Sequence, residues 1–311
     1  MLGVVILVLV GFGFIFGTLG SSLFGIEAPG FIDVTKPHIA LPAEGIAHAG
    51  GFTITNTLIA SWISVIVLIG FFFAATRKMK IIPGRLQSFA EIVVEGILGF
   101  IESASGKEKA RIVFPIVATV FLYVITNAYM ALIPIFGTIG IWEHGHHGDT
   151  FVAMFRGANT DINVPLSIAL VSFVAIEFWG LRAFGFFSYL NTFFNVAQLR
   201  DGIKDLFKGK IGPALSKIAF GFINLFIGCL EILSHFIRII SFTFRLFGNM
   251  TAGEILLLVV VFLVPLIAPI PFYGLELLVG FLQAMIFAGL TLVFGVIALT
   301  PHEHEEEHEK I

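Results

Sequence analysis

The chain has 311 residues, of which 57% are hydrophobic and 13% charged, with 36 phenylalanines and a net charge of −3. Soluble globular chains have about 45–50% apolar and about 25% charged residues, so this composition, with a mean hydropathy of +0.99, excludes a water-soluble enzyme. The small negative net charge indicates no nucleic-acid partner, and the lipid bilayer is the expected solvent.

The sequence lacks the motifs of common catalytic sites. Cys229 is the only cysteine, so no disulfide can form within the chain. The phosphate-binding pattern GxxxxGK[ST], a GxGxxG after a strand and the zinc-binding HExxH are all absent. We therefore expect no cofactor, no metal site and no catalytic residues.

Six apolar stretches are long enough to cross a bilayer, which takes about 20 helical residues. Only helices and closed barrels satisfy their backbone in lipid, and unbroken apolar runs without two-residue alternation favour helices. The expected spans are 3–25, 54–75, 112–134, 162–181, 218–264 and 273–299. The predicted fold class is an all-α polytopic membrane protein.

The first span has two interpretations. It has no basic start and no A-x-A cleavage site before residue 30, which favours a retained membrane helix over a signal sequence. Residues 26–52 are rich in Pro, Gly, Ala and His and predict an exposed loop. We divide the chain into an N-terminal segment with this loop (1–52), a membrane domain (53–300) and an acidic, His-rich tail (301–311).

Basic residues are unevenly distributed among the loops. Loops 76–111 and 182–217 are rich in lysine and arginine, whereas Arg156 is the only basic residue between the third and fourth spans. The positive-inside rule makes these two rich loops cytoplasmic. It makes 26–52, 135–161 and the turn between the last two spans external, and the C-terminus cytoplasmic.

Two further segments have a helical pattern. Residues 85–103 carry apolar side chains at spacings of three and four, which predicts a helix lying at the membrane interface. A continuous helix over 218–264 would be roughly 70 Å long, whereas the hydrocarbon is roughly 30 Å thick. We therefore expect a break near 218–232 and then a long inclined helix, ended by Pro265, that forms a hairpin with the last span.

Ionisable side chains inside membrane spans are expensive and usually functional, and the last third of the chain concentrates them. Segment 218–299 contains Glu231, His235, Arg238, Arg245, Glu254 and Glu276. The seven-residue spacing of Glu231, Arg238 and Arg245 keeps them on one side of a helix. Ser241 and Asn249 flank Arg245 at four residues and extend this polar stripe.

A second polar stripe is expected on another face. Glu254, nine residues after Arg245, falls on roughly the opposite side of its helix, and Glu276 and Gln283 are seven apart on the last span. Two stripes predict two aqueous paths, with Arg245 between them. The distances from Pro265 and Pro271 make Glu276 the shallower of the two outer carboxylates.

Simpler interpretations of these charges remain open. Charged side chains near helix ends extend to the interface, so Glu231 and Arg238 could form an end-of-helix pair and Glu276 could be an interfacial anchor. Arg245 does not fit this alternative, because it lies well inside an apolar run of more than 20 residues.

Four stretches of sequence together resemble a known family. Residues 241–254, SFTFRLFGNMTAGE, closely resemble the signature of the a subunit of F-type ATP synthases, as do 282–287, LQAMIF. Residues 127–134, NAYMALIP, and 160–167, TDINVPLS, are similar to that family's second and third spans. The resemblance covers about residues 50–300, so the extra N-terminal span lies outside it and five spans lie within it.

The resemblance implies a proton-translocating stator subunit that forms two offset half-channels against a rotating ring. The implied partners are the c-subunit ring, b-type peripheral stalk subunits and the remainder of the complex, in a bacterial plasma membrane. The chain would not be an enzyme by itself.

The resemblance also assigns roles to individual residues. Arg245 matches the stator arginine that faces the rotor, and Asn249 its polar neighbour one turn on. The other matched positions are Glu254 and Glu276 in the outer half-channel, Glu231 near the cytoplasmic one, and Gln283 opposite the arginine. The sequence departs from some relatives, which have histidine at position 276 and an acidic residue at position 131, here Ala131.

Two other classes of function are alternatives to a stator subunit. A secondary transporter or simple proton channel would favour an internal repeat, and the sequence has none. A membrane enzyme would need a reactive cluster, and the candidates are His144, His146, His147 and Asp149 in one loop with His302, His304 and His308 in the tail. These two groups are expected on opposite sides of the membrane, so they cannot form one site.

Overall fold

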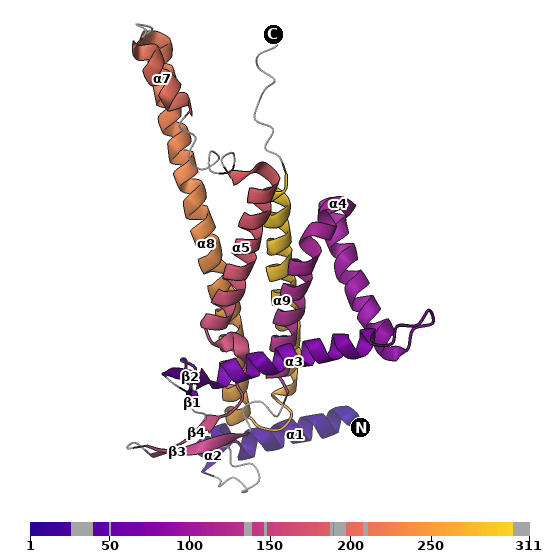
Figure 1. Ribbon diagram of the computed structural model, residues 1–311. Coiled ribbons are helices and arrows are strands. Elements are labelled where there is room, and N and C mark those ends of the chain that lie inside the picture. The colour runs from indigo at the N-terminus through magenta and orange to yellow at the C-terminus, as the bar shows by residue number, and fades with distance from the viewer. Residues whose placement is uncertain are drawn as a thin grey trace. The chain divides into compact units, whose positions relative to one another are not determined.

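The computed structural model describes residues 1–25, 40–49, 51–133, 139–145, 148–186, 189, 197–207 and 211–300. In this part of the chain, five helices are long and apolar enough to cross a membrane (Figure 1). They are α3 (Asn56–Thr76), α4 (Arg85–Ala131), α5 (Asn163–Phe184), α8 (Ile211–Leu263) and α9 (Ile270–Ala298). The expected polytopic all-α fold class is confirmed.

The N-terminal segment, predicted as one span over 3–25, is a bent pair of helices that together are apolar and long enough for a broken span or a re-entrant loop. Helices α1 (Leu2–Phe16) and α2 (Thr18–Phe24) meet at 61° around Gly17, whose backbone is extended. A Cβ atom added at Gly13 would overlap the carbonyl oxygen of Pro265. The hydroxyl of Thr18 donates to the carbonyl of Phe262 at 2.8 Å, so the pair packs against the end of α8.

Helix α4 joins two segments that the sequence analysis treated separately. It runs through the predicted interfacial helix and on into the predicted span over 112–134, with a break at Gly106, where φ is 73° and ψ is 160°. Only glycine adopts such a conformation without strain. The helix over 85–103 is therefore confirmed, but it is one arm of a bent helix.

Helix α8 is continuous over 53 residues, so the break predicted near 218–232 is wrong. Gly221 and Gly228 both keep helical backbone there. Pro213 lies in the first turn of the helix, where its missing N–H removes no hydrogen bond. The helix ends at Leu263, just before Pro265, as expected.

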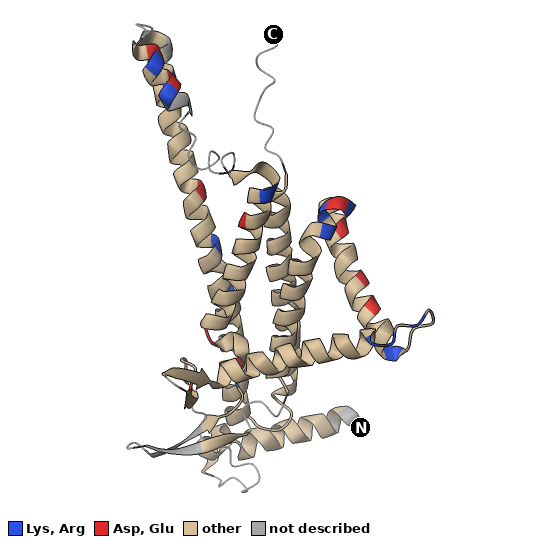
Figure 2. Cartoon of the chain, viewed as in Figure 1, with Lys and Arg blue, Asp and Glu red and all other residues tan. Residues whose placement is uncertain are grey.

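The connecting segments contain short elements that the sequence analysis did not predict. Strand β1 (Gly45–Ala49) pairs with β2 (Phe52–Thr55), and β3 (Gly140–Gly145) pairs with β4 (Gly148–Ala153), both antiparallel. A turn of 3-10 helix, η1 (Ala158–Thr160), precedes α5, and α7 (Ala197–Phe207) precedes α8. Charged residues are concentrated on α7 and at the bend of α4, while α3 and α9 contain almost none (Figure 2).

The chain divides into two compact units. The first unit comprises residues 1–95, 118–165 and 244–288, and the second comprises 96–117, 166–243 and 289–311. Each has its own small core: Val124 and Leu246 are almost fully buried in the first, and Ile101 and Val113 in the second. Many large apolar side chains stay exposed on the long helices, as a lipid-facing surface requires.

Candidate functional site

Arg245 lies on an exposed face of α8 in the first unit. Arg245 and Asn249 are both exposed, whereas Leu246 and Met250 on the other side of the helix are buried. Gly248 is exposed as well, so the surface beside the arginine is open. Within the described residues, Arg245 makes no ion pair or hydrogen bond. Its guanidinium is thus exposed and unpaired within the part of the chain that the structure describes.

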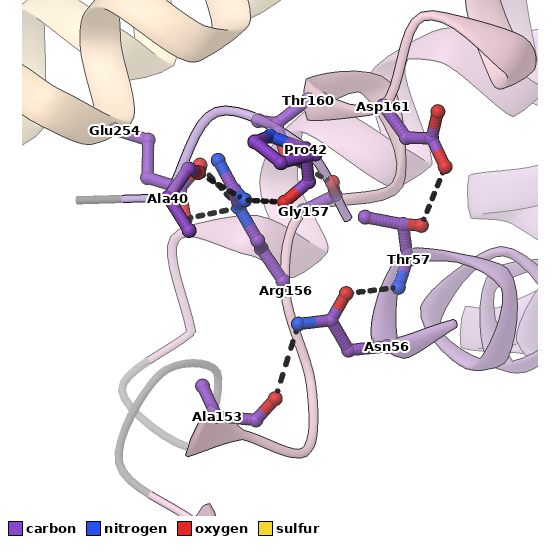
Figure 3. Close-up of polar contacts among 10 residues, drawn as sticks. All are labelled: Ala40, Pro42, Asn56, Thr57, Ala153, Arg156, Gly157, Thr160, Asp161 and Glu254. Carbon is purple, nitrogen blue, oxygen red and sulfur yellow. Dashed lines mark hydrogen bonds and ion pairs between the residues drawn. The ribbon is translucent and has the colours of Figure 1, made fainter. Parts of the chain in front are cut away.

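Glu254 belongs to a different face of α8 and has an intramolecular partner. The Nε atom of Arg156 lies 3.1 Å from each carboxylate oxygen of Glu254 (Figure 3). The side chain of Arg156 is only 10% exposed and that of Glu254 is 29% exposed. The same guanidinium donates to the carbonyl oxygens of Ala40, at 2.6 Å, and Pro42, at 3.3 Å.

The segment that carries Arg156 is tied to the start of α3 on both sides. The Asn56 side chain donates to the carbonyl of Ala153 at 3.2 Å, and the Thr57 hydroxyl donates to Asp161 at 3.0 Å (Figure 3). Asn56 and Thr57 are completely buried. These two bonds bracket Arg156 and hold its side chain toward Glu254.

Glu276 is the more buried of the two predicted outer carboxylates. It is 7% exposed, whereas the Glu254 side chain is 29% exposed. The shallower depth of Glu276 in the membrane stays a prediction, but its burial within the chain is greater than expected. The cause is Gly253 on α8: a Cβ atom there would overlap the carboxylate of Glu276. Because Gly253 has no side chain, α9 brings Glu276 directly against the neighbouring helix.

Glu254 and Glu276 line one cavity, as the sequence analysis expected of a shared site. Its volume is about 120 Å³, and its lining includes Arg156, Asn127 and Asn159. Both asparagines are 2% exposed, and neither side-chain amide has a hydrogen-bond partner among the described residues. The lining is mostly apolar, but its two amides and two carboxylates offer polar partners, and a cavity of this size has room for a few water molecules.

The remaining predicted residues lie elsewhere. Glu231 and Ser241 are half-buried on α8 in the second unit. The guanidinium of Arg238 lies 3.4 Å from the ring centre of Phe294, and no ion pair joins it to Glu231 within the described part of the chain. Gln283, on α9 in the first unit, is 8% exposed and has no hydrogen bond to Arg245 among the described residues.

Several polar residues that the structure places at the cavity or in the second unit were not predicted from the sequence. Arg156 was noted only as a lone basic residue in its loop, and that isolation was the available signal. Asn127 and Asn159 gave no signal, because single asparagines at helix ends are common capping residues. Glu177 lies in an apolar helix, where a lone acidic residue should have attracted notice.

The two histidine clusters fall outside the side chains that the structure describes. His146, His147, His302, His304 and His308 lie outside the described residues, as do the side chains of His144 and Asp149. Among the side chains that the structure describes, no group of three metal-ligating residues converges.

Comparisons with known proteins agree on one family. The model of the ATP synthase A chain family matches residues 58–295. ATP synthase subunit a of Campylobacter jejuni is 34% identical over 221 residues, 71% of this chain and 79% of that protein. The subunits a of Campylobacter concisus and Gloeobacter violaceus are 31% and 27% identical, covering 78% and 81% of this chain and 89% and 86% of theirs.

Proposed function

The chain belongs to the ATP synthase A chain family, and we propose that Arg245 and two offset half-channels carry out its proton translocation. As a subunit a, it is a membrane component of the ATP synthase complex without a catalytic site of its own. The secondary transporter and membrane enzyme considered above have no comparable support.

The proposed role of Arg245 follows from the chemistry of a carboxylate carried by a rotating partner. Burial in lipid disfavours the charged form of a carboxylate, whereas a cation within about 4–6 Å favours it. A fixed arginine therefore makes the rotor carboxylate release its proton at the stator. Arginine suits this task because it stays protonated, so it cannot pass a proton directly between the two paths.

The outer half-channel is proposed to be the cavity that Glu254 and Glu276 line. A proton from outside would be accepted by one carboxylate and passed to the other through water held by the two buried amides. The second half-channel is proposed along the stripe of Glu231 and Ser241, with Asn249 and Gln283 completing the surface near Arg245. Each proton that crosses supplies about 2.3 kcal/mol per 100 mV of membrane potential.

The proposed surroundings follow from the family and from the charge distribution. The partners are a ring of c subunits, b-type stalk subunits and the rest of the complex. The chain is a multi-pass membrane protein with bacterial relatives, and we place it in the bacterial plasma membrane with a cytoplasmic C-terminus. The membrane domain would span residues 53–300, after the N-terminal segment 1–52 and before the tail 301–311.

The guanidinium of Arg245, exposed and without a partner among the described residues, is the observation that carries this proposal. The test is Arg245→Lys, which keeps the positive charge but loses the fixed planar donor set and the permanent protonation. We expect ATP-driven proton pumping in inverted membrane vesicles to fall by on the order of a hundredfold or more. Arg182→Lys, at an exposed position in the last turn of α5, is the matched control and should pump normally.

Pumping near the wild-type level in Arg245→Lys vesicles with normal amounts of assembled complex would refute the role of Arg245. Loss of assembly alone would be recognised by the missing rotor and ATPase subunits in the purified complex.

A further inference from the structure

Three titratable side chains of the second unit form a hydrogen-bonded cluster apart from the cavity. The Nδ1 atom of His235, on α8, lies 2.6 Å from one carboxylate oxygen of Glu177, on α5. The hydroxyl of Tyr189, just after α5, donates to the other oxygen at 2.6 Å. The side chains of His235 and Glu177 are 16% and 20% exposed, so they are enclosed by protein but still reachable.

The tyrosine serves as a fixed donor. Burial, and then the hydrogen bond to Glu177, raise the pKa of Tyr189 well above its usual value. Tyr189 therefore keeps its proton and holds the Glu177 carboxylate in one orientation. The proton that can move in this cluster is the one between His235 and Glu177.

The cluster adjoins the polar stripe of α8. His235 follows Glu231 by four residues and precedes Arg238 by three, so the three share a side of the helix. Both charged neighbours interact electrostatically with the cluster. Phe173 of α5 packs edge-on against His235, with ring centres 5.9 Å apart, and α9 contributes the uncharged ring of Phe294 beside Arg238.

A histidine and a carboxylate at this distance can exchange a proton across a single hydrogen bond. The proton leaves Nδ1 of the imidazolium and joins the carboxylate oxygen, giving a neutral imidazole and a carboxylic acid. The neutral imidazole keeps its proton on Nε2, the carboxylic acid releases the transferred proton to water, and Nδ1 becomes the nitrogen that accepts the next proton. Histidine suits such exchange because its unperturbed pKa of about 6.5 lies near physiological pH.

We propose that Glu177 and His235 form a proton-exchange site on the second aqueous path, next to Glu231 and Arg238. This site deepens the proposed function and rests on it. A contact that only packs α5 against α8 would cost less free energy with apolar side chains, since ionisable groups within membrane spans are costly. Their presence in hydrogen-bonded contact indicates that their protons are used.

The test compares polar and apolar replacements of the pair in the complete ATP synthase, reconstituted into liposomes. His235→Gln and Glu177→Gln keep hydrogen-bonding capacity but remove titration. The double variant Glu177→Leu with His235→Leu replaces the pair by an apolar contact and keeps the two helices packed. Glu95→Gln, an exposed carboxylate on α4, is the control for loss of a glutamate.

The measurements are ATP-driven proton pumping and ATP hydrolysis, from about pH 5.5 to pH 8. We expect both single variants and the Leu pair to pump about three- to tenfold more slowly per assembled complex. The pH profile of their pumping should also differ from that of wild type, because a proton-exchanging pair has been removed. Glu95→Gln should keep the wild-type rate and profile.

A Leu pair that assembles normally and keeps the wild-type rate and pH profile would overturn the proposal and leave only a structural joint. Arg245→Lys, measured in parallel, separates this failure from failure of the proposed function. If Arg245→Lys stops proton pumping while the Leu pair pumps normally, the proposed exchange site is refuted and the proposed role of Arg245 stands.

Discussion

Helix α8 carries one charged residue on each of two faces in the first unit, and only one of these two residues is paired among the described residues. Arg245 is exposed and makes no ion pair or hydrogen bond among the described residues. Glu254, nine residues later, is held by both its oxygens against Arg156, whose guanidinium is nearly buried. One face thus carries a cation that has no partner among the described residues, and the other carries a carboxylate that is paired with an arginine beside a cavity.

This difference concerns the cost of placing a charge within the membrane. A charge in lipid costs about 2.5–3.5 kcal/mol by insertion scales. An exposed charge without a partner among the described residues is therefore unusual within a membrane span, whereas pairing lowers the cost of the other.

The largest effect on the paired face is expected from Arg156→Ala. The change leaves the Glu254 carboxylate without its cation and removes the hydrogen bonds to the backbone carbonyls of Ala40 and Pro42. The position of Glu254 in the cavity is then no longer fixed. We expect proton pumping to fall at least about tenfold, measured in inverted vesicles at matched levels of complex. Adding Glu254→Gln should restore assembly, because no unpaired charge remains, but not pumping. Normal pumping by Arg156→Ala alone would show that the pair is dispensable.

A smaller effect on proton flux is expected from replacing each of the two carboxylates. Glu254→Gln and Glu276→Gln each remove one titrating group from the cavity, and we expect both to slow proton flux several-fold or more. Because Glu276 is the more buried, its change should have at least as large an effect as that at Glu254. Glu276→His should keep more flux than Glu276→Gln, since imidazole also titrates. If both Gln variants conduct protons normally, the cavity is not on the proton path.

The smallest effect on activity is expected from a cysteine substitution used for labelling. Its labelling shows which loops of the chain lie on the cytoplasmic side of the membrane. Ser103 is exposed near the bend of α4, in a loop predicted to be cytoplasmic. In a Cys229→Ser background, Ser103→Cys should pump normally and react with an impermeant thiol reagent only from the cytoplasmic side. Reaction from the outside alone would reverse the proposed orientation of both half-channels.

Much of the fold followed from the sequence because hydropathy determines where helices can cross a bilayer. The long apolar runs, the proline-ended α8 and the helical pattern after Arg85 were all predicted. The break in α8 was wrong, because the argument from length assumed a helix confined to the hydrocarbon thickness. Gly106 and Gly17 were not identified as bends, since the conformation of a glycine depends on what packs around it.

The candidate site was predictable where it depended on charges within helices, and not where it depended on loops. Glu254 and Glu276 were expected to share a site and do line one cavity. The pairing of Glu254 with Arg156 was not expected, because it brings together residues 98 positions apart. The greater burial of Glu276 was missed for a similar reason: it depends on the missing side chain of Gly253, on another helix.

The contact of Thr18 with Phe262 also bears on how the protein is made. The two residues are 244 positions apart, so the N-terminal helix pair cannot dock until most of the polypeptide has been synthesised. At about 5–20 residues per second, the pair waits roughly 10–50 s on the ribosome without its partner surface. During that interval it is an apolar segment that the translation and insertion machinery must shelter, and the protein acquires its final N-terminal packing last.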